Sequence, residues 1–107
     1  MDFKEYQELV GRTAIYPNKG NNFVYPALGL GGETGELQEK IKKILRGDKT
    51  LEESKELIKK EAGDVLWYLT QLCTEVGLTL EEVVKENVFK LFDRRERGVL
   101  KGSGDTR

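Results

Sequence analysis

Hydrophobic residues recur at every third or fourth position along most of this chain, the spacing that places them on one face of an α-helix. One such series, which ends before Gly47, consists of Leu30, Leu37, Ile41 and Ile44. No segment alternates apolar and polar residues for long enough to predict a strand. The pattern therefore predicts an all-α protein. The longest series follows Thr50 and consists of Ile58, Ala62, Val65, Leu69, Leu72 and Val76.

Residues that begin and end helices divide this pattern into four segments. Thr50 and Thr79 suit the position before a helix, and Gly47 and Gly77 suit the position after one. Turn-forming residues predict a loop over 16–22. We therefore expect a bundle of about four helices, followed by a Gly-rich basic tail at about 98–107. The second predicted helix begins between residues 24 and 27 and ends near residue 46. The other three cover about residues 2–14, 51–76 and 80–97.

Composition limits the class of protein. The 107 residues predict a single domain, and because only 37% of them are hydrophobic, association between copies would add buried area. A net charge of −1 argues against binding of duplex nucleic acid, which normally needs a basic excess. The single cysteine, Cys73, excludes an internal disulfide and lies on an apolar helical face, as a small core residue would. No apolar run approaches the roughly 20 residues that a membrane span needs, so we expect a cytoplasmic protein.

Two pairs of acidic residues carry the most informative chemistry. Glu33 and Glu36 are three residues apart, as are Glu61 and Asp64, so each pair shares one helix face. If the two helices face each other, four carboxylates converge, and such a group must take up protons, find cations or bind metal. Because the chain has no histidine, the site would be all oxygen, which suits Mg²⁺ first and Mn²⁺ second.

The surroundings of these two pairs set them apart from other acids at the same spacing. The first pair follows the weakly charged run at 23–32, and the second leads directly into the apolar run at 65–69. Carboxylates beside a core need a reason to be there. The other pairs have polar neighbours and are typical of solvated helix faces: Glu5 with Glu8, and Glu53 with Glu56.

Further candidates accompany the acids. Tyr68 follows Asp64 by one turn on the same face. Glycine costs a helix interior up to about 1 kcal/mol relative to alanine, so either a close helix crossing or a ligand would explain the four glycines around the first acidic pair. They are Gly29, Gly31, Gly32 and Gly35.

The last helix and the tail carry candidate phosphate ligands. Asn87 is expected to face the core, where its amide would bond backbone, a carboxylate, or a base or sugar. Lys90 and Arg94 follow on nearly the same face, although each alone is more often a solvated cation. The basic tail with its Gly102-Ser103-Gly104 segment could either wrap a phosphate or be disordered.

With their flanking residues, the acidic pairs resemble those of the MazG-like nucleoside triphosphate pyrophosphohydrolases, the all-α NTP pyrophosphatase superfamily. The segments 25–36 and 61–69 resemble the two metal-binding helices of that family. Asn87-x-x-Lys90-Leu91 with Arg94 resembles its final helix, and the ending 97–105 looks like that of small stand-alone members. The resemblance covers nearly the whole chain.

The resemblance implies Mg²⁺-dependent hydrolysis of an NTP or dNTP between the α- and β-phosphates, giving nucleoside monophosphate and pyrophosphate. It also implies a homodimer or homotetramer, with a nucleotide rather than nucleic acid or a membrane as partner. With no histidine available, Glu36 is the carboxylate that we favour as general base. The residues that would hold Mg²⁺ are Glu33, Glu36, Glu61 and Asp64. The residues that would face nucleotide or phosphate are Tyr68, Asn87, Lys90 and Arg94.

Three other interpretations remain open at this point. A phosphoribosyl-ATP pyrophosphohydrolase shares the fold and the acids, but the terminal segments here look less like one. A helical nucleotide-sensing or interaction module would keep the acids without turnover. A helical dimerisation domain with solvated acids predicts that Mg²⁺ leaves melting unchanged, and that Glu61→Gln and Asp64→Asn leave stability unchanged or higher.

Overall fold

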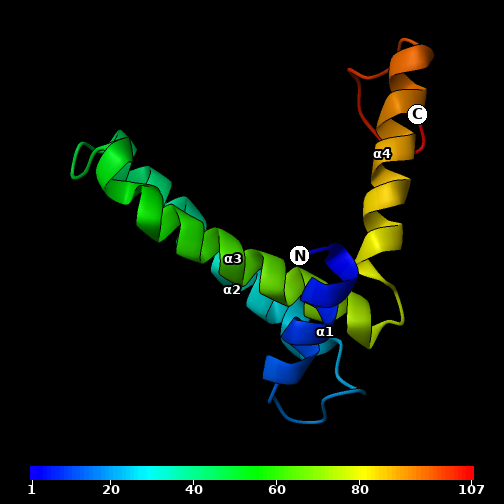
Figure 1. Cartoon of the computed structure of the whole chain (residues 1–107). Helices are drawn as coiled ribbons and strands as arrows, with labels where there is room; N and C mark the ends of the chain where they lie inside the picture. Colours follow the sequence, from blue (N-terminus) through cyan, green and yellow to red (C-terminus); the bar gives the residue numbers. More distant parts are fainter.

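The computed structural model describes residues 1–107 and contains four helices and no strand (Figure 1). This confirms the all-α class and the four predicted segments. No helix is both long enough and apolar enough to cross a membrane. The helices are α1 (Phe3–Thr13), α2 (Val24–Leu45), α3 (Leu51–Glu75) and α4 (Leu80–Glu96).

Side-chain caps fix the helix ends where the sequence predicts them. Thr50 accepts a hydrogen bond from the backbone N–H of Glu53, whose carboxylate accepts one from the backbone N–H of Thr50. The same reciprocal arrangement begins α4 at Thr79. Gly47 and Gly77 follow α2 and α3 with φ of 88° and 78°, a left-handed conformation that glycine adopts at little cost.

The α2 and α3 helices lie side by side as a long hairpin, and α1 packs across one end of it (Figure 1). The α4 helix contacts α1 and extends away from the hairpin. Its acidic and basic residues are therefore carried on an arm rather than on the hairpin surface.

One α1 side chain, Gln7, fixes the junction from which α4 departs. Its Nε2 donates to Thr74 Oγ1 at 2.9 Å and to the Leu78 carbonyl at 3.0 Å. Its Oε1 accepts from the backbone N–H of Leu80 at 2.8 Å. Because both ends of the amide are bonded, the connection between α3 and α4 is held against α1.

The core of the single chain is small, with 10 of 107 residues buried. Cys73 is buried, as predicted. The predicted apolar face of α3 is only partly covered, because Ala62 and Val76 are exposed. The polar side chains of Thr70 and Gln71 are buried in the core instead. Thr70 donates a hydrogen bond to the Leu66 carbonyl, and Gln71 donates one to the Tyr16 hydroxyl. Apolar side chains of α4 also face solvent, among them Val88, Phe89, Leu91 and Phe92.

Candidate metal centre

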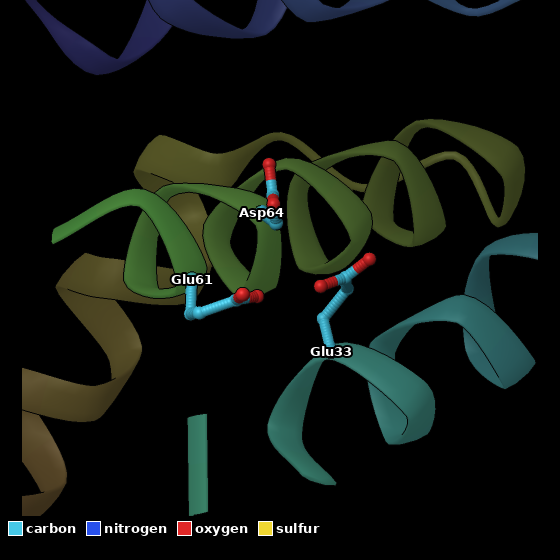
Figure 2. Close-up of side chains that lie close together, drawn as sticks. All are labelled: Glu33, Glu61 and Asp64. Carbon is cyan, nitrogen blue, oxygen red and sulfur yellow. The ribbon is translucent and has the colours of Figure 1, made fainter. Parts of the chain in front are cut away.

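Three of the four predicted carboxylates converge between the two long helices. Glu33 comes from α2, and Glu61 and Asp64 come from α3. One oxygen of each lies within 4.8 Å of the others. Figure 2 shows Glu33 and Glu61 extending toward each other across the space between the helices. The spacing of three residues and the α2–α3 hairpin together place these groups on facing surfaces.

The fourth acid, Glu36, stands outside this group. Its side chain is 59% exposed, and its Oε2 lies 3.9 Å from Lys40 Nζ, one turn further along α2. The same ammonium is 3.7 Å from Glu61 Oε1, and the side chains of Lys40 and Glu61 are both only 18% exposed. Lys40 therefore supplies one positive charge at the edge of the carboxylates and links Glu36 to them.

Electrostatics at the centre favour a bound positive charge. Partial burial is the largest influence that raises the pKa of Glu33, followed by its hydrogen-bonding contact with Glu61 and the charges of Asp64, Glu61 and Glu36. A carboxyl group in that situation either retains a proton or shares a cation.

The donor set fits a hard divalent cation. All three side chains offer carboxylate oxygen, the ligand that Mg²⁺ and Mn²⁺ prefer, and the chain offers no histidine that would favour zinc. Oxygens on opposite sides of an octahedral Mg²⁺ lie about 4.2 Å apart. A third oxygen at right angles to these lies about 3 Å from each, so the three side chains would close in around a bound ion from separations within 4.8 Å.

An aromatic cavity adjoins the carboxylates. It has a volume of about 260 Å³ and is lined by Glu33, Asp64, Trp67 and Tyr68. Tyr68 is thus beside the acids, where the sequence places it. Trp67 was missed, because the sequence shows it only as part of the apolar run that follows Asp64.

The predicted need for glycine in α2 is met at one position. A β-carbon at Gly29 would lie 2.1 Å from Cε1 of Tyr68, so the close approach excludes any other residue without a shift of the ring. Gly31, Gly32 and Gly35 have no neighbour within 4 Å of such an atom, so the single chain does not explain them.

The predicted α4 residues lie apart from this cavity. Asn87 is exposed and lines a different cavity of about 490 Å³ with Lys90 and Glu86, so the expectation that it faces a core is wrong for this chain. The reason is that α4 extends away from the hairpin (Figure 1), and Asn87 is left exposed.

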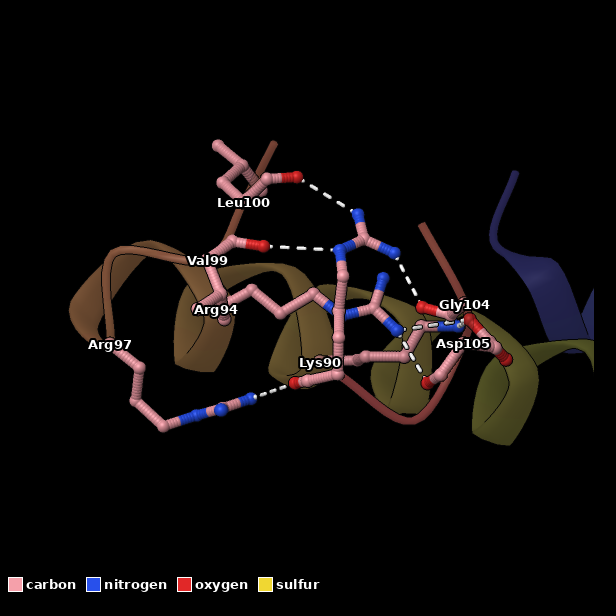
Figure 3. Close-up of polar contacts among 8 residues, drawn as sticks. Lys90, Arg94, Arg97, Val99, Leu100, Gly104 and Asp105 are labelled. Atoms are coloured by element: carbon pink, nitrogen blue, oxygen red, sulfur yellow. Dashed lines mark hydrogen bonds and ion pairs between the residues drawn. The ribbon is translucent and has the colours of Figure 1, made fainter. Parts of the chain in front are cut away.

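Lys90 and Arg94 instead hold the tail (Figure 3). Lys90 Nζ donates to Asp105 Oδ1 at 2.7 Å, and Arg94 Nη2 donates to the same oxygen at 3.0 Å and to the Asp105 carbonyl at 2.5 Å. Hydrogen bonds from Lys90 and then Arg94 lower the pKa of Asp105. Arg94 is only 5% exposed.

The tail after α4 is folded rather than extended. The Arg107 guanidinium donates to the carbonyls of Val99, Leu100 and Gly104, and Arg97 donates to the Arg107 carbonyl. We call the segment 98–107 the tail clasp, because these bonds close it back onto α4.

Comparison with known proteins matches most of the chain to one family. The sequence model of the MazG nucleotide pyrophosphohydrolase domain matches residues 27–99, a span that contains all four acids and the predicted nucleotide-facing residues. The chain is also similar to the Gene 37 protein of Mycobacterium phage L5, with 40% identity over 109 residues that cover 95% of this chain and 96% of the phage protein. No solved structure matches the chain.

Proposed function

Because the chain belongs to the MazG nucleotide pyrophosphohydrolase family, we propose that it hydrolyses a nucleoside triphosphate, NTP or dNTP, between the α- and β-phosphates with Mg²⁺ as cofactor. The products are nucleoside monophosphate and pyrophosphate. The family match supports nucleotide pyrophosphohydrolase activity in general. The observation that carries the Mg²⁺-dependent reaction is the convergence of Glu33, Glu61 and Asp64 from two helices.

Each acid has a role in this proposal. Glu33, Glu61 and Asp64 hold the cation, with Glu36 one helical turn away as a further ligand or as general base. When bound, the cation neutralises the polyphosphate and lowers the pKa of the attacking water. Water adds to one phosphorus atom, the bridging P–O bond breaks, and pyrophosphate or the monophosphate leaves with that oxygen.

Glu36 is the acid that we assign as general base. Its side chain is 59% exposed and outside the group of three, which supports a role toward the attacking water rather than toward the cation. Its carboxylate accepts the proton that the water loses. Lys40 Nζ lies 3.9 Å from Glu36 and 3.7 Å from Glu61, so its positive charge lies between the proposed base and a proposed metal ligand.

Assembly of copies is part of the proposal. The α4 helix leaves Phe89 71% exposed and Phe92 53% exposed, on an arm that the hairpin does not cover. Association would bury this apolar surface. We propose a homodimer or homotetramer, in which the Lys90 and Asn87 side chains of one copy approach the polyphosphate held by another. Light scattering on the purified protein measures the number of copies.

A turnover panel tests the reaction. The protein is incubated with each common NTP and dNTP, with Mg²⁺, with Mn²⁺ or with EDTA, and the products are separated. The expected products are monophosphate and pyrophosphate, formed with metal and not with EDTA. Asp64→Asn and Glu61→Gln should abolish turnover, whereas Glu56→Gln, an exposed acid on the same helix, should not.

Other outcomes would overturn the proposal. Diphosphate and orthophosphate as products would place the cleavage at a different bond. Metal-dependent nucleotide binding without any turnover would instead support a sensing module. Turnover of phosphoribosyl-ATP alone would support a phosphoribosyl-ATP pyrophosphohydrolase.

A further inference from the structure

The aromatic residue beside the carboxylates lines their cavity and is held in a fixed position. Trp67 lies one helical turn after Asp64 on α3 and lines the same cavity as Glu33 and Asp64. A ligand whose charged end is held at the carboxylates would therefore place its remaining atoms within reach of this ring.

Trp67 is held by the first helix. Its indole Nε1 donates to Thr13 Oγ1 at 2.8 Å. The Thr13 hydroxyl in turn donates to the Val10 carbonyl at 2.9 Å, within the last turn of α1. Because its only polar atom is already bonded, Trp67 can offer a ligand nothing but its apolar ring.

The neighbouring Tyr68 ring does not stack on Trp67. Trp67 and Tyr68 meet at an interplanar angle of 80°, with centroids 5.0 Å apart. In such an edge-to-face contact one ring meets the other with its edge, so Tyr68 covers at most one face of Trp67. The Tyr68 ring packs closely on the backbone at Gly29, which prevents it from moving further toward α2.

We propose that Trp67 is the platform on which the nucleobase of the substrate stacks, an inference that rests on the proposed function. A fixed aromatic face next to a polyphosphate site fits the two ends of a nucleotide. Stacking is tolerant of base identity because every base has a π-face. Trp67 therefore gives affinity for nucleotides over base-free polyphosphates, with purines ahead of pyrimidines because their rings overlap more area.

Kinetics of two variants test the platform. Trp67→Leu should raise KM for a purine triphosphate about tenfold or more, the loss expected for one stacked base, with a smaller change in kcat. Trp67→Phe keeps an aromatic face but not the N–H, so it should recover most of the affinity. Inorganic tripolyphosphate has no base, and its inhibition constant should be the same for the wild type and both variants.

Fluorescence gives a second readout that does not need turnover. Trp67 is the only tryptophan, so emission excited selectively in tryptophan, and not in the four tyrosines, reports on it alone. With Mg²⁺ present, an α,β-methylene nucleoside triphosphate should change the emission on stacking, and tripolyphosphate should not.

The possible results separate the two proposals. Turnover with an unchanged KM in Trp67→Leu, or an equal loss of affinity for nucleotide and tripolyphosphate, would overturn the platform and leave the hydrolase intact. Absence of both turnover and a nucleotide-dependent emission change would overturn both. An emission change without turnover would support the platform and count against the hydrolase.

Discussion

The ring of Tyr68 lies so close to α2 at Gly29 that a β-carbon there would come within 2.1 Å of its Cε1 atom. Tyr68 also lies 6.5 Å, centroid to centroid, from Tyr25, which stacks on Tyr16 at 4.7 Å. The rings of Tyr16, Tyr25 and Tyr68 therefore form a row from the loop before α2 to the carboxylates. This close approach requires glycine at position 29, inside α2, although glycine lowers the stability of a helix.

Gly29→Ala should destabilise the protein, by about 1–3 kcal/mol for overpacking, and should raise KM because Tyr68 must shift. Gly31→Ala, two residues along the same helix with open space around it, should be neutral or stabilising by up to about 1 kcal/mol. Denaturant unfolding of both variants measures the difference. Equal effects from the two substitutions would mean that the contact with Tyr68 does not constrain the helix.

Mg²⁺ should raise the melting temperature of the wild-type protein. A ligand that binds only the folded state, at one hundred times its dissociation constant, adds about 2.7 kcal/mol. Asp64→Asn should remove this gain and, without metal, should leave stability unchanged or higher, because one of three close carboxylates loses its charge. Calorimetry with and without Mg²⁺ provides the measurement. A full shift retained in Asp64→Asn would show that the cation binds elsewhere, and Glu56→Gln serves as the control.

Stability should decline in acid through Glu75. Its carboxylate accepts hydrogen bonds from the Tyr16 hydroxyl and from the backbone N–H groups of Gly20 and Asn22. The bond from Tyr16 contributes most to lowering its pKa below the ordinary 4.5. The stabilisation is therefore complete above pH 4.5 and is lost as pH falls through the lowered pKa.

Glu75→Gln should lose about 1.5–3 kcal/mol at pH 7, the usual contribution of hydrogen bonds to a charged group. Its stability should also depend less on pH below 4.5. Urea unfolding between pH 3 and 7 compares it with the wild type and with Glu8→Gln, an exposed acid on α1. Parallel curves for Glu75→Gln and the wild type would contradict the role of Glu75.

The tail clasp should open when Arg94, which bonds it to α4, is replaced. Arg94→Gln takes away bonds to both the carboxylate and the carbonyl of Asp105, so amides in 98–107 should exchange hydrogen faster. Arg95→Gln, an exposed arginine next along the helix, should leave exchange in the clasp unchanged. Mass spectrometry of the exchanged peptides provides the readout, and unchanged protection in Arg94→Gln would mean that the Arg107 bonds hold the clasp without it.

Features that depend on neighbours in sequence could be predicted. The capping threonines Thr50 and Thr79 fix helix starts through residues three positions away, and Gly47 and Gly77 end helices by their own backbone conformation. The convergence of acids follows from similarly local rules, since three-residue spacing orients each pair and one short turn brings α2 and α3 together.

Features that depend on distant contacts could not be predicted. The direction of α4 is set by Gln7, more than 70 residues before Leu80, so the sequence could not show that Asn87 would be uncovered. Trp67 is oriented by Thr13 on another helix, and periodicity places it in an apolar run without showing which side chain turns toward the acids. Periodicity finds an apolar face but not the element that covers it.

The pairing of Asp105 with Lys90 and Arg94 changes what anion binding on α4 means. These cations are not bare positive surface awaiting a phosphate, because the Asp105 carboxylate already pairs with both and offsets one of their two charges. An incoming phosphate would have to displace Asp105 from these cations, so the local charge would change little. Added salt would therefore weaken this exchange less than it weakens ordinary ion pairing. Its apparent affinity would be the intrinsic affinity multiplied by the fraction of molecules in which the tail clasp is open. The tail thus raises the concentration of a small anion that α4 needs before it binds one.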